Sequence, residues 1–105
     1  MKRLILVAAG VAMAAAAATA GPAAAQQADG RLLAMACLNC HGPGGKSQGD
    51  IPTIAGKTED FIKKALSEFR DGKRTGTAAT IMPRLAKGYS DADIDALAKY
   101  IATLK

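Results

Sequence analysis

Apolar residues recur every three or four positions in three stretches of the chain, and this spacing predicts three helices. The first helix covers about residues 29–40, with Asp29 in the position of an N-cap. The second covers about residues 58–71, with Thr58 as its N-cap. The third begins at residues 90–93, where Ser-Asp-Ala-Asp resembles a capping box. Because no stretch alternates convincingly at the strand period of two, the predicted fold class is all-α.

Glycine and proline mark the connections between these helices. The first helix is predicted to end at residues 41–45, His-Gly-Pro-Gly-Gly, because this sequence cannot continue a helix. Residues 73–87 separate the second and third helices and contain Met82 followed by Pro83. A residue before proline is pushed towards extended backbone, so Met82 is predicted to lie on a loop.

The first 25 residues have the three parts of a secretory signal. Lys2 and Arg3 form a basic start, residues 4–20 are uncharged and apolar, and small residues end at Ala25. The alternative is a membrane anchor, but the run is close to the lower length limit for a span and is mostly alanine. Cleavage after Ala25 predicts a single domain, residues 26–105, without a stable membrane span and located in the periplasm.

Composition limits what this domain can do. The formal net charge of +5 includes Lys2 and Arg3, so the 80 residues after the signal carry +3, a balance that does not suggest nucleic-acid binding. They contain no tryptophan and only four aromatic residues: Phe61, Phe69, Tyr89 and Tyr100. A small domain with so few large apolar side chains usually needs additional stabilisation from a disulfide, a metal or a cofactor.

Residues 37–41 read Cys-Leu-Asn-Cys-His, the C-x-x-C-H signature of c-type haem attachment. Two thiols on one helical turn can add across the two vinyl groups at one edge of a haem, and the next residue then points its imidazole at the iron. Cys37 and Cys40 are therefore the predicted covalent attachment points of one haem c. His41 is the only histidine of the chain and is the predicted axial ligand.

Two cysteines have other uses in an exported protein. They can form a disulfide. They can also form a thioredoxin-like redox centre, although no strand precedes Cys37 as that motif requires. A zinc site would need more cysteines or histidines than this chain has. Haem attachment is the favoured interpretation because the motif follows an export signal.

Met82 is the predicted sixth ligand of the iron. Met1 and Met13 leave with the signal, and Met35 lies two residues before Cys37 on the helix that carries the attachment motif. Met35 therefore cannot reach the opposite face of the haem, which leaves Met82, and Met/His ligation is usual in cytochromes c. The alternative is that Met82 fills a gap in the core.

Residues 37–42, 82–83 and 97–101 resemble the corresponding motifs of class I cytochromes c, and the resemblance extends over the whole domain. In that family the first and last helices cross near the haem edge, which implies that Gly30, Leu33 and Ala34 meet Leu97, Tyr100 and Ile101. The family also uses a backbone carbonyl to accept the Nδ1 proton of the ligand histidine. Pro52 is the matching position, and such a bond fixes the ring.

Residues 46–56, 69–74 and 82–91 are also similar to the cytochrome subunits of flavocytochrome c sulfide dehydrogenases. Well-known subunits of this type carry two haem domains, whereas this chain has one C-x-x-C-H motif. The resemblance implies either a single-haem subunit or a free carrier. Its partner in sulfide oxidation would be a flavoprotein on which the sulfur chemistry takes place.

The predicted function is one-electron transfer, because an iron with two filled axial positions has nowhere to bind a substrate. The alternative is a haem enzyme or gas sensor with a labile Met82, for which Arg84 is a weak distal candidate and no second histidine exists. Basic residues flank Met82 in the sequence and are predicted to steer an acidic partner: Lys73, Arg74, Arg84 and Lys87.

Overall fold

A computed structural model describes residues 21, 27–76 and 80–105, so most of the predicted signal, residues 1–25, lies outside the described part. All regular structure in the described part is helical, which confirms the all-α fold class. The elements in chain order are α1 (Gly30–His41), the 3₁₀ turn η1 (Pro43–Gly45), α2 (Glu59–Arg70), α3 (Met82–Ala86) and α4 (Asp91–Ile101). Within these ranges no helix is both long and apolar enough to cross a membrane.

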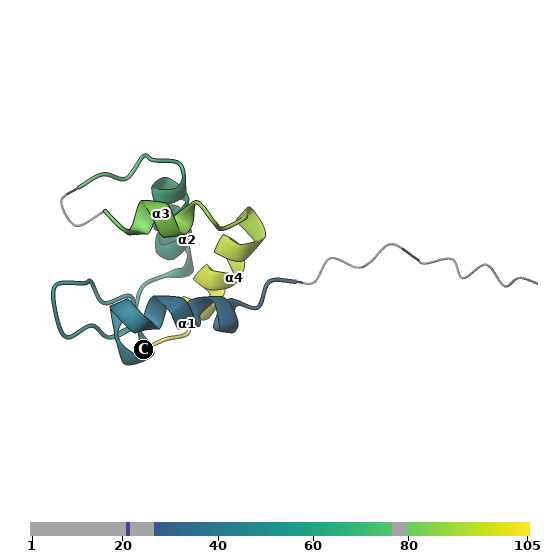
Figure 1. The fold of residues 1–105 in the computed structure, drawn as a ribbon. Helices are drawn as coiled ribbons and strands as arrows, with labels where there is room; N and C mark the ends of the chain where they lie inside the picture. Colours follow the sequence, from purple (N-terminus) through teal and green to yellow (C-terminus); the bar gives the residue numbers. More distant parts are fainter. Residues whose placement is uncertain (1–20, 22–26, 77–79) are drawn as a thin grey trace, which may run out of the picture.

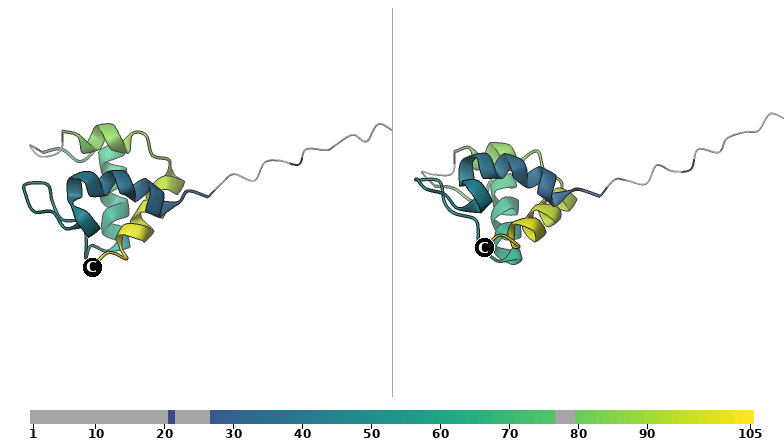
Figure 2. Two further views of the ribbon diagram at one scale, coloured as in Figure 1. Left: turned by 60° about the horizontal axis from the view of Figure 1, so that its bottom comes forward. Right: turned by 90° about the horizontal axis from the view of Figure 1, so that it is seen from below.

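The packing order of the helices differs from their order in the chain. Helix α4 packs on both α1 and α2, and α3 packs on α2. Figure 1 shows the result: α1 lies on one side of the molecule and α3 on the other, with α4 beside them. The two further views in Figure 2 show the same arrangement. The two helices that carry the predicted iron ligands are thus held apart by α2 and α4.

The predicted N-caps are confirmed. A side-chain oxygen of Asp29 accepts hydrogen bonds from the backbone N–H of Arg31 and Leu32 at 3.0 and 3.3 Å. The Thr58 hydroxyl accepts from a backbone N–H at the start of α2. Ser90 and Asp93 form a complete capping box, each accepting a backbone N–H of the other. These bonds satisfy N–H groups that the first turn of a helix leaves without partners.

The prediction that Met82 lies on a loop is wrong, because Met82 is the first residue of α3. Pro83 follows in the first turn, where its missing N–H would have no partner inside the helix in any case. The pre-proline restriction is a preference that tertiary packing can override. Here α3 is held against α2 and buries Ala86 completely.

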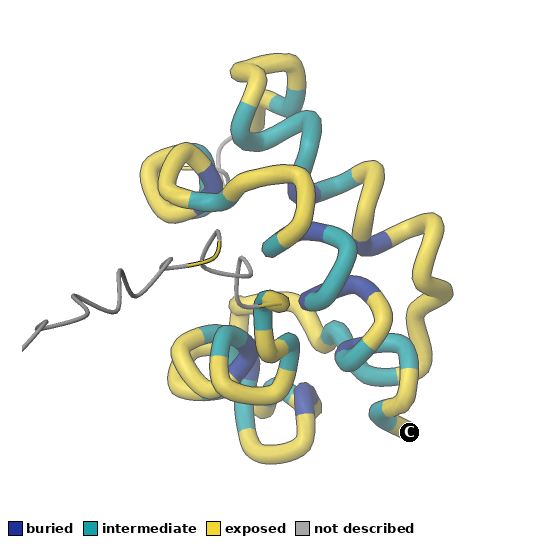
Figure 3. The backbone as a smooth tube through the Cα atoms, turned by 90° about the vertical axis from the view of Figure 1, so that its right-hand side faces the viewer, coloured by how far each residue is buried: buried dark blue, intermediate teal, exposed yellow. Residues whose placement is uncertain are grey.

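The core lies where α4 meets α1 and α2, as the buried stretches in Figure 3 indicate. Among the described residues, Ile94 and Leu97 are the only large side chains that are fully buried. Several partly buried side chains surround this cluster: Leu33, Cys37, Ile54, Met82, Tyr89 and Tyr100. Cys37 and Met82, from opposite sides of the molecule, therefore adjoin the same small core.

Helices α1 and α4 cross in contact, as the resemblance implied. A Cβ atom added at Gly30 would overlap the backbone carbonyl of Ala96 and lie 3.2 Å from the Cβ of Tyr100. Further along the same crossing, Ala34 belongs to one buried cluster with Leu97 and Ile101. The glycine is needed because the two backbones approach too closely for any side chain.

We expect Gly30→Ala to lower the free energy of unfolding by about 1–3 kcal/mol, the usual cost of overpacking a close contact. A decrease in stability would be informative, because alanine has a higher helix propensity than glycine and would otherwise stabilise α1. Gly49→Ala is the matched control, since no atom lies within 4 Å of a Cβ at that position. Denaturant titrations of the two variants provide the measurement, and equal stabilities would contradict the close crossing.

Candidate haem-binding site

The last turn of α1 presents Cys37 and Cys40 in different environments. Cys37 is partly buried and packs against the core, whereas Cys40 is exposed. The two sulfurs are not joined in a disulfide. Burial, and to a lesser extent the neighbouring Cys40, raises the pKa of the Cys37 thiol. A redox-active cysteine pair needs the opposite, a lowered pKa, so this environment does not favour a thioredoxin-like centre.

His41 is the last residue of α1 and is only 9% exposed. Its Nδ1 atom lies 2.5 Å from the backbone carbonyl oxygen of Pro52. A carbonyl oxygen can only accept, so Nδ1 carries the proton and donates. The Nε2 atom then holds the lone pair that can bind a metal. The contact that the resemblance implied for Pro52 is present in the structure.

The loop after α1 brings Pro52 back to His41. Gly42 has a positive φ of 88°, and a Cβ there would overlap the carbonyl of Lys46, so the turn out of α1 requires glycine. Further along, the backbone N–H groups of Ile54 and Ala55 both donate to the carbonyl of Gly45, at 2.9 and 3.0 Å. The imidazole is therefore oriented by backbone geometry.

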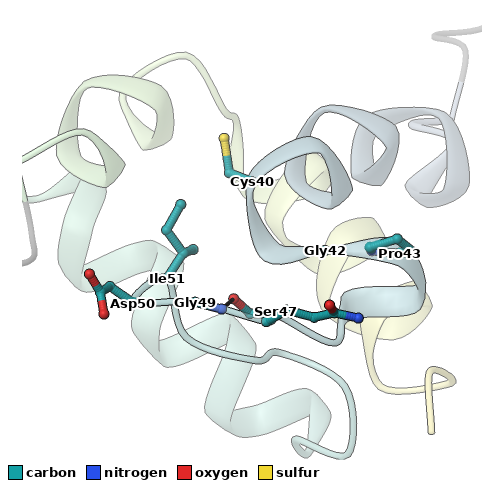
Figure 4. Close-up of a pocket in the computed structure, with 8 residues that line it drawn as sticks. Cys40, Gly42, Pro43, Ser47, Gly49, Asp50 and Ile51 are labelled. Carbon is teal, nitrogen blue, oxygen red and sulfur yellow. Dashed lines mark hydrogen bonds between the residues drawn. The ribbon is translucent and has the colours of Figure 1, made fainter.

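This loop bounds an open pocket of about 480 Å³ beside Cys40. Figure 4 shows the Cys40 sulfur and the Ile51 side chain projecting from the pocket lining into the same space. Ile81, the residue before α3, and Leu85 on α3 are 65% and 52% exposed. Large apolar side chains thus remain uncovered near both predicted ligands. Sequence reasoning noted Ile51 only as the neighbour of Pro52 and gave Ile81 and Leu85 no role of their own, because an isolated isoleucine or leucine carries no motif.

The residues fit a haem better than a bare metal ion. The end of α1 offers an imidazole nitrogen and the start of α3 a thioether sulfur, the two donor types that Met/His-ligated haem uses. Two thiols on one turn of α1 match the two vinyl groups. Among the described residues, no group of three histidine, cysteine, aspartate or glutamate side chains is arranged to hold a metal ion.

The four basic residues predicted to steer a redox partner are not all free of carboxylate partners. Arg74 is one of the four basic residues expected to steer a partner, but its guanidinium pairs with Glu68 at 3.0 Å. Within the described residues, Arg84 and Lys87 on and just after α3 have no carboxylate within 4.0 Å. Because Glu68 also pairs with Lys64, it neutralises Arg74 only in part. Lys73 is exposed and, like Arg84 and Lys87, has no carboxylate within 4.0 Å among the described residues.

Comparison with known proteins decides the family. The family model for cytochrome c matches residues 14–105. The chain belongs to the cytochrome c family. Its match to the cytochrome subunit of sulfide dehydrogenase from Chlorobaculum tepidum is 40% identical over 93 residues, 83% of this chain and 82% of that protein.

Two further relatives are named simply as cytochromes. Cytochrome c-554(547) from Halothiobacillus neapolitanus is 38% identical over 94 residues, 82% of this chain and all of that protein. Cytochrome c-553 from Nitratidesulfovibrio vulgaris is 36% identical over 86 residues, 80% of this chain and 84% of that protein. As a member of this family, the cytochrome carries covalently attached haem c, transfers electrons to or from a redox partner and is not itself catalytic.

Proposed function

We propose that this cytochrome is a periplasmic single-haem electron carrier, with thioether bonds at Cys37 and Cys40 and with His41 and Met82 as axial ligands. The hydrogen bond between His41 Nδ1 and the Pro52 carbonyl, 2.5 Å long, carries the proposal. It orients the ring directly after the C-x-x-C pair and leaves Nε2 for the iron. When bound, the haem iron accepts and releases one electron.

The protein residues set how readily that electron moves. The soft sulfur of Met82 stabilises the ferrous state and so raises the reduction potential. Partial burial of Met82 against the core limits the access of water to that side. With His41 and Met82 both as ligands, a bound haem iron would have no coordination position free for a substrate. These roles describe a carrier whose ligands stay in place through the redox cycle.

We further propose that the redox partner is a flavoprotein dehydrogenase acting on a reduced sulfur compound. The support is the relative named as the cytochrome subunit of sulfide dehydrogenase, which matches this chain over most of both lengths. In that arrangement the sulfur chemistry takes place on the partner, and this chain removes the electrons. Whether the two proteins form a permanent complex or meet transiently is tested by the salt experiment below.

Intact mass spectrometry tests haem attachment directly. The protein is produced in a host that attaches haem to exported cytochromes, and we expect the mass of residues 26–105 plus one haem. Cys37→Ala and Cys40→Ala, made singly, are each expected to keep one thioether at most and to yield less haem-loaded protein. A haem-free mass that is lower by two hydrogens would instead indicate a Cys37–Cys40 disulfide and would refute the proposal.

We expect the double change Arg84→Glu/Lys87→Glu to slow second-order electron transfer with an anionic partner several-fold at low salt. Steering by exposed charges acts mainly on the association rate and is screened over about 8–10 Å at ordinary salt, so the deficit should shrink as salt rises. Lys99→Glu/Lys105→Glu is the matched control, because both lysines are exposed and the net charge changes equally. Stopped-flow rates against ionic strength provide the measurement.

The two modes of association predict different outcomes in that experiment. A transient carrier shows a larger deficit for the α3 variant than for the control. A permanent subunit with an apolar interface shows rates that hardly depend on salt or on either pair of substitutions. Equal deficits for both pairs would indicate that net charge, and not the surface around Met82, governs the encounter.

A further inference from the structure

Each residue from 53 to 56, directly after Pro52, takes part in a hydrogen bond. The first three of them bond within the same loop, to residues 45–47. The fourth, Gly56, donates its backbone N–H to the carbonyl oxygen of Leu104 at 2.9 Å. The loop is thus closed on itself beside Pro52 and is then attached to the segment that follows α4.

The Leu104 side chain makes a second contact with this loop. A Cβ atom added at Gly45 would lie 3.2 Å from Cδ1 of Leu104 and 3.1 Å from Cγ1 of Ile54. Gly45 is buried and Leu104 is half-buried, so the leucine methyl group packs directly on the glycine. The carbonyl of this glycine accepts the N–H groups of Ile54 and Ala55. Leu104 therefore supports the loop where its two halves are hydrogen-bonded to each other.

The turn after α4 fixes Leu104 in turn. Its backbone N–H donates to the carbonyl of Ile101 at 3.0 Å, and the N–H of Thr103 donates to the carbonyl of Tyr100 at 2.9 Å. Ile101 is 2% exposed and belongs to the buried cluster. Figures 1 and 2 show the segment after α4, in yellow, running towards the loop that follows α1. Leu104 thus connects the core of the protein to that loop.

We propose that Leu104 is a positioning residue that keeps the Pro52 carbonyl oxygen on Nδ1 of His41. The inference rests on the proposed ligation of the haem iron by His41. Leu104 packs on Gly45 and accepts a hydrogen bond from Gly56, and these two residues bound the part of the loop that contains Pro52. The Pro52 carbonyl oxygen lies 2.5 Å from the imidazole and fixes its orientation. Leu104 acts through this loop and needs no contact with the haem.

Exchange of the His41 Nδ1 proton with solvent tests this proposal, because the proton exchanges when its bond to the Pro52 carbonyl opens. NMR spectroscopy of the haem-loaded ferrous protein measures the rate. We expect Leu104→Ala to speed the exchange about three- to tenfold, which corresponds to losing part of the burial of one leucine side chain. Leu104→Met, which retains most of the apolar volume, should exchange at close to the rate of the unaltered protein.

Gly30→Ala is the matched control for a general loss of stability. Its added methyl group overpacks the crossing of α1 and α4 and not the loop. In each variant the backbone N–H of Leu97, which is fully buried in α4, reports global unfolding. We expect Gly30→Ala to speed exchange at His41 no more than at Leu97, and Leu104→Ala to speed exchange at His41 by the larger factor. Equal factors at both sites in Leu104→Ala, or no change at either, would refute the positioning role.

The chemical shifts of the His41 ring in the unaltered ferrous protein separate this proposal from the ligation on which it rests. An imidazole bound to the iron lies over the face of the haem, and the ring current of the haem moves its carbon-bound ring protons far upfield. Shifted ring protons together with an unchanged Nδ1 exchange rate in Leu104→Ala refute the positioning role alone. Ring protons at ordinary shifts refute the ligation by His41 and the positioning role together.

Discussion

Replacing Met82 with alanine lowers the reduction potential of the cytochrome by roughly 0.1–0.3 V, a substantial part of the ≈ 0.8 V range that axial ligands span. As a ligand, the thioether would stabilise ferrous iron. The other methionine among the described residues, Met35, is 60% exposed on α1 beside the attachment motif and is not placed to substitute for it. The iron becomes high-spin or takes an external ligand. Redox titration and the ferric absorption spectrum provide the measurements.

Met35→Ala is the control for that result. It removes a thioether from the surface of α1 and should leave both the spectrum and the potential unchanged. If Met82→Ala also leaves them unchanged, another group completes the coordination. A sixth position that is already empty in the unaltered protein would instead support a gas-binding function.

The chain without haem should lose cooperative unfolding altogether. In the described part of the chain the buried cluster contains seven residues, two of them alanines, and only Ile94 and Leu97 are both large and fully buried. Burial on this scale barely offsets the conformational entropy of ordering the chain. With the proposed attachment at Cys37 and Cys40 and ligation by His41 and Met82, the haem would join α1 to α3, and its loss would remove that connection.

Thermal unfolding followed by circular dichroism measures this effect in Cys37→Ala/Cys40→Ala. The unaltered chain made in a host without haem attachment is the control, because it lacks the cofactor but keeps both cysteines. We expect broad, low-amplitude transitions from both proteins and a sharp transition from the haem-loaded form. A sharp, fully helical transition in the double variant would show that the protein core alone is sufficient.

The local sequence determined where each long helix begins. Asp29, Thr58 and Ser90 cap α1, α2 and α4 as predicted, because an N-cap depends on a side chain and on backbone groups two or three residues away. The C-x-x-C-H motif is equally local, since one helical turn sets the spacing of its thiols and the position of its histidine.

The Pro52 contact required more than local sequence. No spacing rule joins residues 41 and 52, and it was the resemblance to a known family that indicated this pair. In the structure the bond forms because Gly42 turns the chain out of α1, and because the Gly45 carbonyl accepts hydrogen bonds from the part of the loop that returns towards His41. Such a contact depends on the path of eleven residues, which periodicity cannot describe.

Only the tertiary structure decided the surroundings of Met82. The proline rule favoured a loop, yet packing against α2 makes Met82 the first residue of α3, since a five-residue helix is stable only where a neighbour supports it. From the sequence, Arg74 was expected to be a free surface charge, but in the folded chain it forms an ion pair with Glu68. Both differences have one physical reason: the decisive partners are distant in sequence or lie across a turn, and only the folded chain brings them into contact.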